Sequence, residues 1–179
     1  MAMLDIKNLT TQFSTENGTV QAVRDVTIQV EKGEILGIVG ESGSGKSQTM
    51  YSVMGLLASN GRVAEGEISI DGRDISPKNY TKKEYDDIMS HIRGNDMAMI
   101  FQDPMTFLNP VLTIETQLTE PILNHNDISK EEARERAIEL MKKVGIPSPE
   151  KRIKQYPFQF SGGMRQRIII AMALACNPK

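Results

Sequence analysis

The residues that this chain largely lacks exclude several classes of protein. Cys176 is the only cysteine, so an internal disulfide is excluded and the chain suits a reducing compartment. The longest apolar run, residues 168–176, has nine residues, whereas a membrane-spanning helix needs about 20. The N-terminal residues Met1–Lys7 carry an acid at the fifth position and do not form an apolar h-region, so they are not typical of a secretory signal. We therefore expect a cytoplasmic chain that reaches a membrane only through a partner.

An excess of charge of either sign is also missing. The 21 lysines and arginines nearly balance the 23 aspartates and glutamates, and the formal net charge is −2. A protein that binds nucleic acid mainly through its phosphates would carry a basic excess or stripe. His91 and His125 are the only histidines, and we assign no function to either. The composition therefore favours a protein that binds no nucleic acid.

The apolar pattern along the 179 residues predicts one α/β domain. Alternating apolar and polar residues predict half-buried strands at 4–13, 20–30 and 66–71. Short continuous apolar runs at 34–39 and 97–101 are typical of strands that are buried on both faces of a parallel sheet. The first of these runs leads directly into a glycine-rich segment.

Residues at helical spacing predict helices after that glycine-rich segment and through most of the second half of the chain. Because residues 105–156 hold no strand pattern, we interpret them as a helical insertion in the α/β core. Ser129-x-x-Glu132 is a capping box that opens one helix, and Gly145 ends it. The other helices are predicted at 47–57, at 81–93, at 114–122 with a bend at Pro121, and at 164–176.

The segment Gly40-Glu41-Ser42-Gly43-Ser44-Gly45-Lys46-Ser47 fits G-x-x-x-x-G-K-[ST], the pattern of a phosphate-binding loop. Its glycines permit backbone torsions closed to other residues and let amide N–H groups turn inward around a phosphate. Lys46 would supply a full charge to the β- and γ-phosphates, and the Ser47 hydroxyl would bind Mg²⁺. Gln48 completes the expected nucleotide-binding segment. The predicted flanking strand and helix make an ordinary Gly-Ser turn the weaker interpretation.

A second candidate anion site is Phe160-Ser161-Gly162-Gly163-Met164-Arg165-Gln166-Arg167. Its serine hydroxyl and glycine amides stand at the start of a predicted helix, where an anion is favoured. In the simpler alternative, Ser161 is only an N-cap and the glycines form a turn. The segment resembles the signature motif of ABC-type ATPases, which closes over the nucleotide of the opposing subunit. The resemblance implies that Ser161, Gly162 and Gly163 bind the ATP of a second subunit.

Residues 101–110 read Phe-Gln-Asp-Pro-Met-Thr-Phe-Leu-Asn-Pro, which closely resembles the Q-loop of ATP-binding subunits of oligopeptide and dipeptide ABC importers. The resemblance implies that Gln102 reaches Mg²⁺ and the attacking water, and that the following residues face the membrane permease. Phe107 departs from the serine expected there. Phe13 stands where ABC proteins carry an aromatic that stacks on adenine. Without the resemblance, Gln102 is a solvated loop residue and Phe13 a core residue.

The aromatic, the phosphate loop, the Q-loop, the helical insertion and the signature follow one another as in the N-terminal part of such a subunit. The resemblance implies a P-loop NTPase fold of the ABC type that is truncated at its C-terminus. It places the strand with the Mg²⁺-binding and water-activating carboxylates beyond Lys179, so we expect no ATP turnover from residues 1–179 alone. The implied parts are an antiparallel β-subdomain (1–33 and 62–75), a P-loop core (34–61, 76–104 and 164–179) and a helical subdomain (105–163).

The resemblance also implies cofactors and partners. ATP and Mg²⁺ are the expected cofactors, and the parent protein is expected to hydrolyse ATP to drive peptide import. Expected partners are a second ABC ATPase subunit, transmembrane permease subunits and, indirectly, an extracytoplasmic peptide-binding protein. The chain would lie in the cytoplasm, peripheral on the inner face of the plasma membrane. Two alternatives stay open: a soluble ABC ATPase without a transport role, and an inactive truncated module that binds nucleotide.

Overall fold

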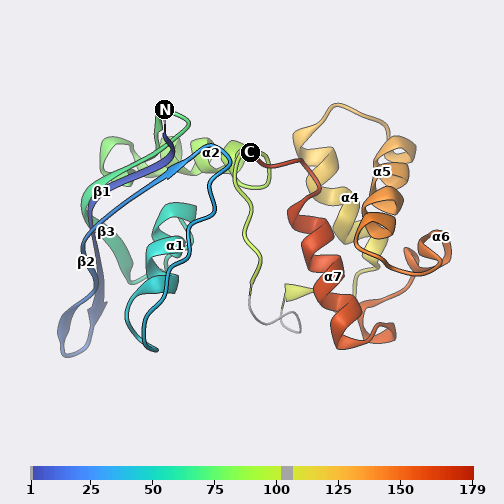
Figure 1. Ribbon diagram of the computed structural model, residues 1–179, viewed down its shortest axis with the longest axis horizontal. Coiled ribbons are helices and arrows are strands. Elements are labelled where there is room, and N and C mark those ends of the chain that lie inside the picture. The colour runs from blue at the N-terminus through green and yellow to red at the C-terminus, as the bar shows by residue number, and fades with distance from the viewer. Residues whose placement is uncertain (1, 102–106) are drawn as a thin grey trace. The chain divides into compact units, whose positions relative to one another are not determined.

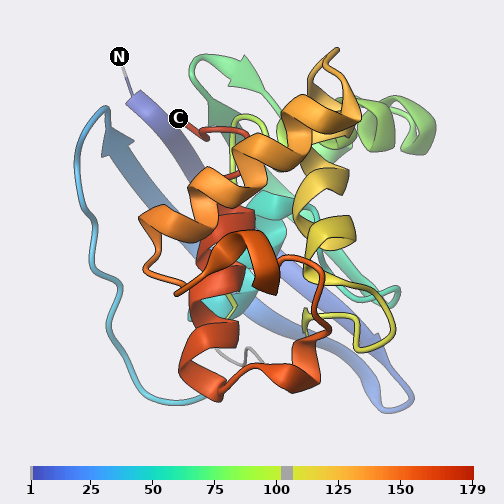
Figure 2. The ribbon, with the colours of Figure 1, turned by 90° about the vertical axis from the view of Figure 1, so that its right-hand side faces the viewer.

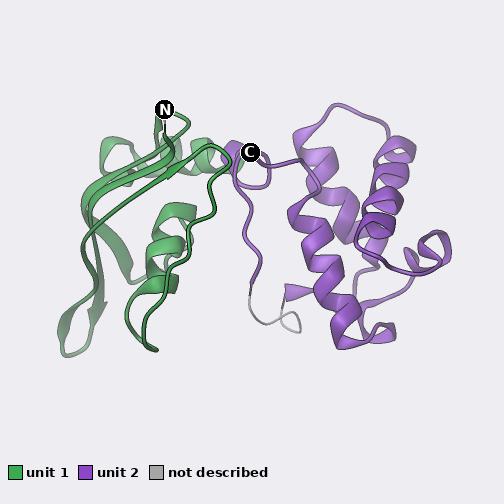
Figure 3. Ribbon diagram, viewed as in Figure 1, with its two compact units in different colours: residues 1–90 green, residues 91–179 purple. Residues whose placement is uncertain are grey.

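The computed structural model describes residues 2–101 and 107–179, which fall into two compact units (Figure 3). The first unit is Met1–Ser90 and the second is His91–Lys179. The named strands lie in the first unit, and most of the helices lie in the second (Figure 1). The strands are β1 (Ala2–Thr15), β2 (Gly18–Glu31), β3 (Gly61–Ile70) and β4 (Arg73–Asp74). The helices are α1 (Lys46–Met54), η1 (Pro77–Asn79), α2 (Lys82–Ile92), α4 (Ile114–His125), α5 (Lys130–Lys143), α6 (Pro149–Arg152), η2 (Pro157–Gln159) and α7 (Gly162–Ala173).

An antiparallel sheet with the order β2-β1-β3-β4 organises the first unit. It confirms the three predicted alternating strands, which the structure extends by a few residues. One face is apolar because side chains alternate along a strand, and it buries Ile6, Leu9, Val23 and Ile68. The α1 helix contacts β1, β2 and β3 (Figure 1).

Three neighbouring strands of this sheet share a backbone irregularity. Asn8 in β1, Asp25 in β2 and Gly66 in β3 all have positive φ, at 50°, 47° and 99°. Asn8 Nδ2 donates to Asp25 Oδ1 over 2.7 Å, and the Asp25 N–H donates to Thr10 Oγ1 over 3.2 Å. A Cβ on Gly66 would lie 2.6 Å from the Leu9 Cα. The β1 register shifts against both neighbours here, so the strands share one aligned bulge.

Two predicted strands are wrong. Residues 34–39 and 97–101 form no strand, apart from a single bridge between Arg93 and Met97. In residues 2–101 and 107–179, no strand pairs with either segment, and a strand needs a neighbour to bind its N–H and C=O groups. Ile35 and Val39 are therefore 96% and 93% exposed. The strand-forming composition is present, but the described residues supply no partner strand.

Asp74 ties the end of the sheet to the η1 turn. Its Oδ1 accepts from the Ser76 N–H and hydroxyl over 2.9 and 2.6 Å, and its Oδ2 accepts from Asn79 Nδ2 over 2.6 Å. Burial by itself would raise the pKa of the Asp74 carboxyl. The hydrogen bonds from Ser76 and Asn79 together outweigh that effect and hold the pKa below its ordinary value of 3.8.

The stabilisation that the ionised Asp74 carboxylate gives to the first unit should be lost in acid. A carboxyl with a lowered pKa in the fold stabilises fully above its unfolded pKa, and this stabilisation is lost as the pH falls through the folded value. We expect Asp74→Asn to flatten the fall in unfolding free energy between about pH 5 and pH 3. Urea titrations of both proteins at several pH values measure this slope. Equal slopes would show that Asp74 is not responsible.

The second unit is a helical core made by α4, α5 and α7, which pack against one another (Figure 2). The predicted apolar stripe is confirmed, because Ile114, Leu118 and Ile122 are fully buried. The predicted capping box at the start of α5 is also present in full. Pro121 lies inside α4, which continues to His125. No helix in the described part of the chain is both long and apolar enough to cross a bilayer.

Candidate functional site

The glycine-rich loop joins directly onto the N-terminus of α1. Gly45 is the N-cap of this helix and has a φ of 90°, in the left-handed region. A Cβ at Gly45 would lie 2.5 Å from the carbonyl oxygen of Ala22 in β2. Glycine is therefore required here twice, for its torsion and for the close approach to the sheet. The end of the loop therefore packs closely against β2.

The Lys46 ammonium lies at the centre of the loop. Its Nζ donates to the carbonyl oxygens of Gly40 and Glu41 over 2.7 and 2.6 Å, and to Ser44 Oγ over 3.2 Å. The loop therefore curls around this one cation, next to the positive end of α1. Residues 40–44 and Ser47 are exposed, so the loop is accessible to a ligand. The predicted phosphate-loop residues are thus gathered in one place, with Gln48 on the first turn of α1.

Buried hydroxyl groups attach α1 to the sheet, and the sequence pattern did not reveal them. The hydroxyls of Thr11 in β1 and Ser52 in α1 lie 2.7 Å apart. The Ser52 hydroxyl donates in addition to the Gln48 carbonyl oxygen over 2.7 Å, so Thr11 is the donor to Ser52. Thr11 and Ser52 are at most 1% exposed. Strand alternation did not single out Thr11, because Leu9, Thr10 and Thr11 are all buried and the register of β1 shifts between them.

Phe13 lies on β1 two residues beyond Thr11, so the two side chains share a face of the sheet. Phe13 pairs with Val20 in β2 and Gly61 in β3. A Cβ at Gly61 would lie 2.5 Å from Phe13 Cε1, which shows that the ring covers this glycine. The structure therefore puts the predicted adenine-stacking residue on the sheet face to which α1 is attached.

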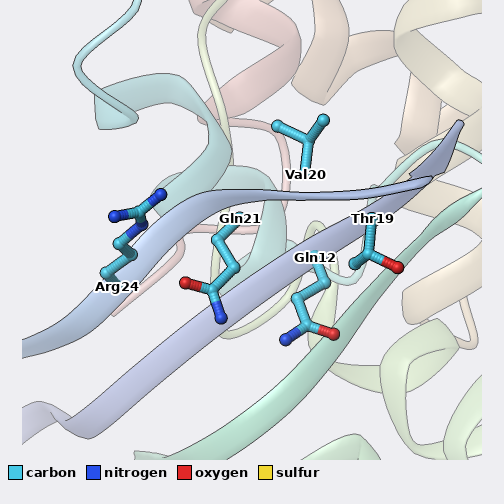
Figure 4. Close-up of a pocket in the computed structure, with 5 residues that line it drawn as sticks. All are labelled: Gln12, Thr19, Val20, Gln21 and Arg24. Carbon is cyan, nitrogen blue, oxygen red and sulfur yellow. The ribbon is translucent and has the colours of Figure 1, made fainter. Parts of the chain in front are cut away.

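A polar pocket of about 640 Å³ lies on the β1–β2 hairpin (Figure 4). Sequence reasoning did not identify it, since its side chains form no motif. Gln12 and Gln21 pair across the two strands, and Phe13 is not among the lining residues. Figure 4 shows the side chains of Gln12, Gln21 and Thr19 pointing away from that of Val20. The lining residues are Gln12, Thr19, Val20, Gln21 and Arg24.

The signature segment begins α7 in the second unit. Ser161 is the N-cap, and its Oγ accepts from the Met164 N–H over 3.4 Å. Ser161, Gly162 and Gly163 are exposed. Gly162 and Gly163 have no positive φ, and a Cβ at either would meet nothing within 4 Å. The fold of this chain therefore does not itself require glycine at these two positions.

Interactions within the second unit stabilise the turn that precedes the signature segment. Arg165 Nε donates to the carbonyl oxygens of Pro157 and Phe160 over 2.8 and 3.0 Å. Phe160 is only 3% exposed, and the Arg152 guanidinium lies 5.9 Å from its ring centre. Arg165 and Phe160 thus hold the start of α7 in position. The sequence placed both in the motif without predicting these structural roles.

The residues present fit a nucleotide with a bound magnesium ion. The loop combines torsions that only glycine adopts readily, a central ammonium and exposed amides at a helix start, which is a set of donors suited to phosphate. The exposed Ser47 hydroxyl on the same turn is a hard oxygen ligand of the kind that Mg²⁺ prefers. No group of three or more acidic, histidine or cysteine side chains in the described residues could hold a metal by itself. Gln102, the other predicted magnesium ligand, lies outside the described residues.

Comparison with known proteins identifies the family. A sequence profile of the ABC transporter family matches residues 23–179. The chain belongs to the ABC transporter family. It is 51% identical to the oligopeptide transport ATP-binding protein OppD of Bacillus subtilis over 178 residues, or 99% of this chain and 48% of that protein. It is also 51% identical to the dipeptide transport ATP-binding protein DppD of the same organism, over 98% of this chain and 51% of that protein.

Solved structures of ABC cassettes have the same fold as this ABC transporter family member. The dimeric structure of MJ0796, a bacterial ABC transporter cassette, matches with a TM-score of 0.81 at 31% identity, over 98% of this chain and 71% of that chain. A post-hydrolysis state of MJ0796 bound to ADP and Pi matches with a TM-score of 0.79. The predicted ABC-type fold is thereby confirmed. The chain spans about half the length of the curated relatives it matches.

Proposed function

We propose that this chain is part of the ATP-binding subunit of a peptide importer, which binds and hydrolyses MgATP to drive a membrane permease. The observation that carries the proposal is the loop of residues 40–47, wrapped around the Lys46 ammonium at the start of α1. Identity of 51% to oligopeptide and dipeptide transport ATP-binding proteins supports peptides as the cargo of the transporter. The proposed location is the cytoplasmic face of the membrane, reached through permease subunits.

In this proposal each loop residue makes a different contact with the nucleotide. The amides of residues 40–45 bind the phosphate oxygens, and Lys46 neutralises charge on the β- and γ-phosphates. Ser47 would hold Mg²⁺, which supplies charge neutralisation on the same phosphates. Gln102 is the proposed second contact to the metal and to the attacking water. Phe13 stacks on the adenine from the sheet face that α1 shares.

The signature residues are proposed to bind the nucleotide of a second ABC subunit. Ser161, Gly162 and Gly163 are exposed, and the glycines have open space around them. Glycine costs about 0.8–1.0 kcal/mol relative to alanine inside a helix, and no close contact among the described residues requires it at these two positions. Close approach of a phosphate from another subunit is a reason to keep glycine there. The division into a β-subdomain, a P-loop core and a helical subdomain stays a prediction.

Gly163→Ala should weaken dimer formation without lowering the stability of the fold. The variant should be as stable as the wild type or more stable, by at most about 1 kcal/mol, since the site is open and alanine favours a helix. MgATP-dependent dimer formation, measured by sedimentation velocity, should weaken at least threefold. Glu139→Ala, an exposed change on α5 outside the signature segment, is the control and should preserve the dimer. Normal dimerisation of Gly163→Ala would contradict the proposed contact between subunits.

A melting experiment tests nucleotide binding, and co-purification tests the permease partner. MgATP at 100 times its Kd should stabilise the chain by about 2.7 kcal/mol, and omission of Mg²⁺ should reduce this shift. An unchanged melting temperature in the presence of MgATP would contradict the proposed nucleotide binding.

Capture of permease subunits from solubilised membranes supports the transport role. Capture of soluble partners alone would instead favour an ABC ATPase without a transport role.

A further inference from the structure

The buried contact between Thr11 and Ser52 links the two parts of the proposed nucleotide site. Thr11 lies in β1 two residues before Phe13, and Ser52 lies in α1 seven residues after Gly45. The first partner therefore sits beside the proposed adenine contact, and the second belongs to the helix that carries the phosphate loop. Any shift of α1 along the sheet would change the distance between these two contacts.

The buried residues of α1 are two apolar ones, Val53 and Met54, and two with hydroxyl groups, Thr49 and Ser52. The apolar contacts do not by themselves define the position of the helix. Val53 and Met54 of α1 and Val23 of β2 are at least 92% buried, and apolar contacts are not directional. The Thr11–Ser52 hydrogen bond is directional, spans 2.7 Å and is shielded from water. Gly45 gives a second fixed point, since its Cα lies against the Ala22 carbonyl group. At 1.5 Å per residue these two points are about 10 Å apart along α1.

We propose that the Thr11–Ser52 hydrogen bond is a positioning device that sets the distance between the base-stacking Phe13 and the phosphate loop, so that one nucleotide reaches both. A ligand that engages two contacts gains affinity only where their spacing matches its own length. Inorganic tripolyphosphate engages the loop alone and does not depend on that spacing. The proposal rests on the proposed nucleotide-binding function of this chain.

The ratio of tripolyphosphate Kd to ATP Kd reports how much affinity the nucleotide gains by engaging both contacts. Isothermal titration in Mg²⁺ of the full chain and of Thr11→Val and Ser52→Ala gives both constants. Both variants should bind ATP about three- to tenfold more weakly, while tripolyphosphate affinity changes less than twofold. Thr11→Ser retains the hydroxyl and should restore the wild-type ratio. A purely structural contribution would lower the two affinities together.

Ser76→Ala is the matched control because Ser76 is another fully buried hydroxyl of the first unit. Its Oγ accepts from the Ile68 N–H over 2.9 Å and donates to Asp74, away from α1. This variant should melt earlier than the wild type without a change in the Kd ratio. If Thr11→Val does not fold, Ser52→Ala and Thr11→Ser still test the proposal by the same ratio.

The outcomes separate this inference from the proposed function. An unchanged ratio in Thr11→Val and Ser52→Ala, or an equal change in Ser76→Ala, would overturn the positioning role and leave nucleotide binding intact. A wild-type chain that binds neither ATP nor tripolyphosphate would overturn the proposed function and this inference together. A wild-type chain that binds tripolyphosphate as tightly as ATP would leave the loop intact but refute the base contact that the inference needs.

Discussion

Lys46→Ala should weaken MgATP binding about 10- to 100-fold, because a charge-assisted hydrogen bond to a phosphate contributes about 1.5–3 kcal/mol. At an ATP concentration of 100 times the wild-type Kd, a 100-fold loss reduces ligand stabilisation from about 2.7 to about 0.4 kcal/mol. The Lys46 ammonium is bound by three loop oxygens. Titration with a fluorescent ATP analogue measures the loss.

The control for this change is a lysine outside the loop. Lys32 is exposed and belongs to the same unit. Lys32→Ala therefore changes the net charge by the same amount as Lys46→Ala. It should bind MgATP within about twofold of the wild type, since exposed charges beyond the Debye length of ~8 Å are screened at physiological salt. Wild-type affinity in Lys46→Ala would exclude the loop as the phosphate site. Equal losses in both variants would point to general electrostatics instead.

Gly66→Ala should strongly destabilise the sheet. The backbone at Gly66 has a φ of 99°, and the new Cβ would lie 2.6–2.7 Å from three backbone atoms of β1. Neither a rotamer change nor a side-chain shift relieves such a clash, because the opposing atoms are the Leu9 Cα and the carbonyl oxygens of Asn8 and Lys7. We expect a loss of about 2–4 kcal/mol in unfolding free energy, measured by urea titration.

Gly37→Ala is the comparison that isolates the clash. Gly37 belongs to the same unit, has no positive φ, and a Cβ there would meet nothing within 4 Å. Its replacement should change the unfolding free energy by at most about 1 kcal/mol. A similar effect of the two substitutions would mean that the aligned bulge at Asn8, Asp25 and Gly66 opens easily. The sheet would then be less rigid at this point than its contacts indicate.

The features that could be predicted correctly depend on residues close together in the sequence. The capping box of Ser129 and Glu132 joins groups three residues apart. The loop from Gly40 to Ser47 is equally local, because its torsions and the helix that follows are determined by neighbouring residues. The buried stripe of α4 follows from helical periodicity alone.

The two strand predictions that were wrong show the opposite case. Residues 34–39 and 97–101 have the composition of buried strands, and composition reports only what a segment prefers when a partner is present. A strand also needs a neighbour to satisfy its backbone hydrogen bonds, and no periodicity within the segment reveals whether one is available. Ile35, at 96% exposed, shows the result in the described residues.

The sequence by itself determined the family motifs, the helix starts and the torsions of the phosphate loop, since each depends on interactions within a few residues. Only the tertiary structure decided how that loop is held: the approach of Gly45 to the Ala22 carbonyl group and the hydrogen bond from Thr11 to Ser52. These partners lie 23 and 41 residues apart in the chain. Their meeting depends on the packing of α1 against a sheet whose register was set by long-range strand pairing, which no local pattern encodes.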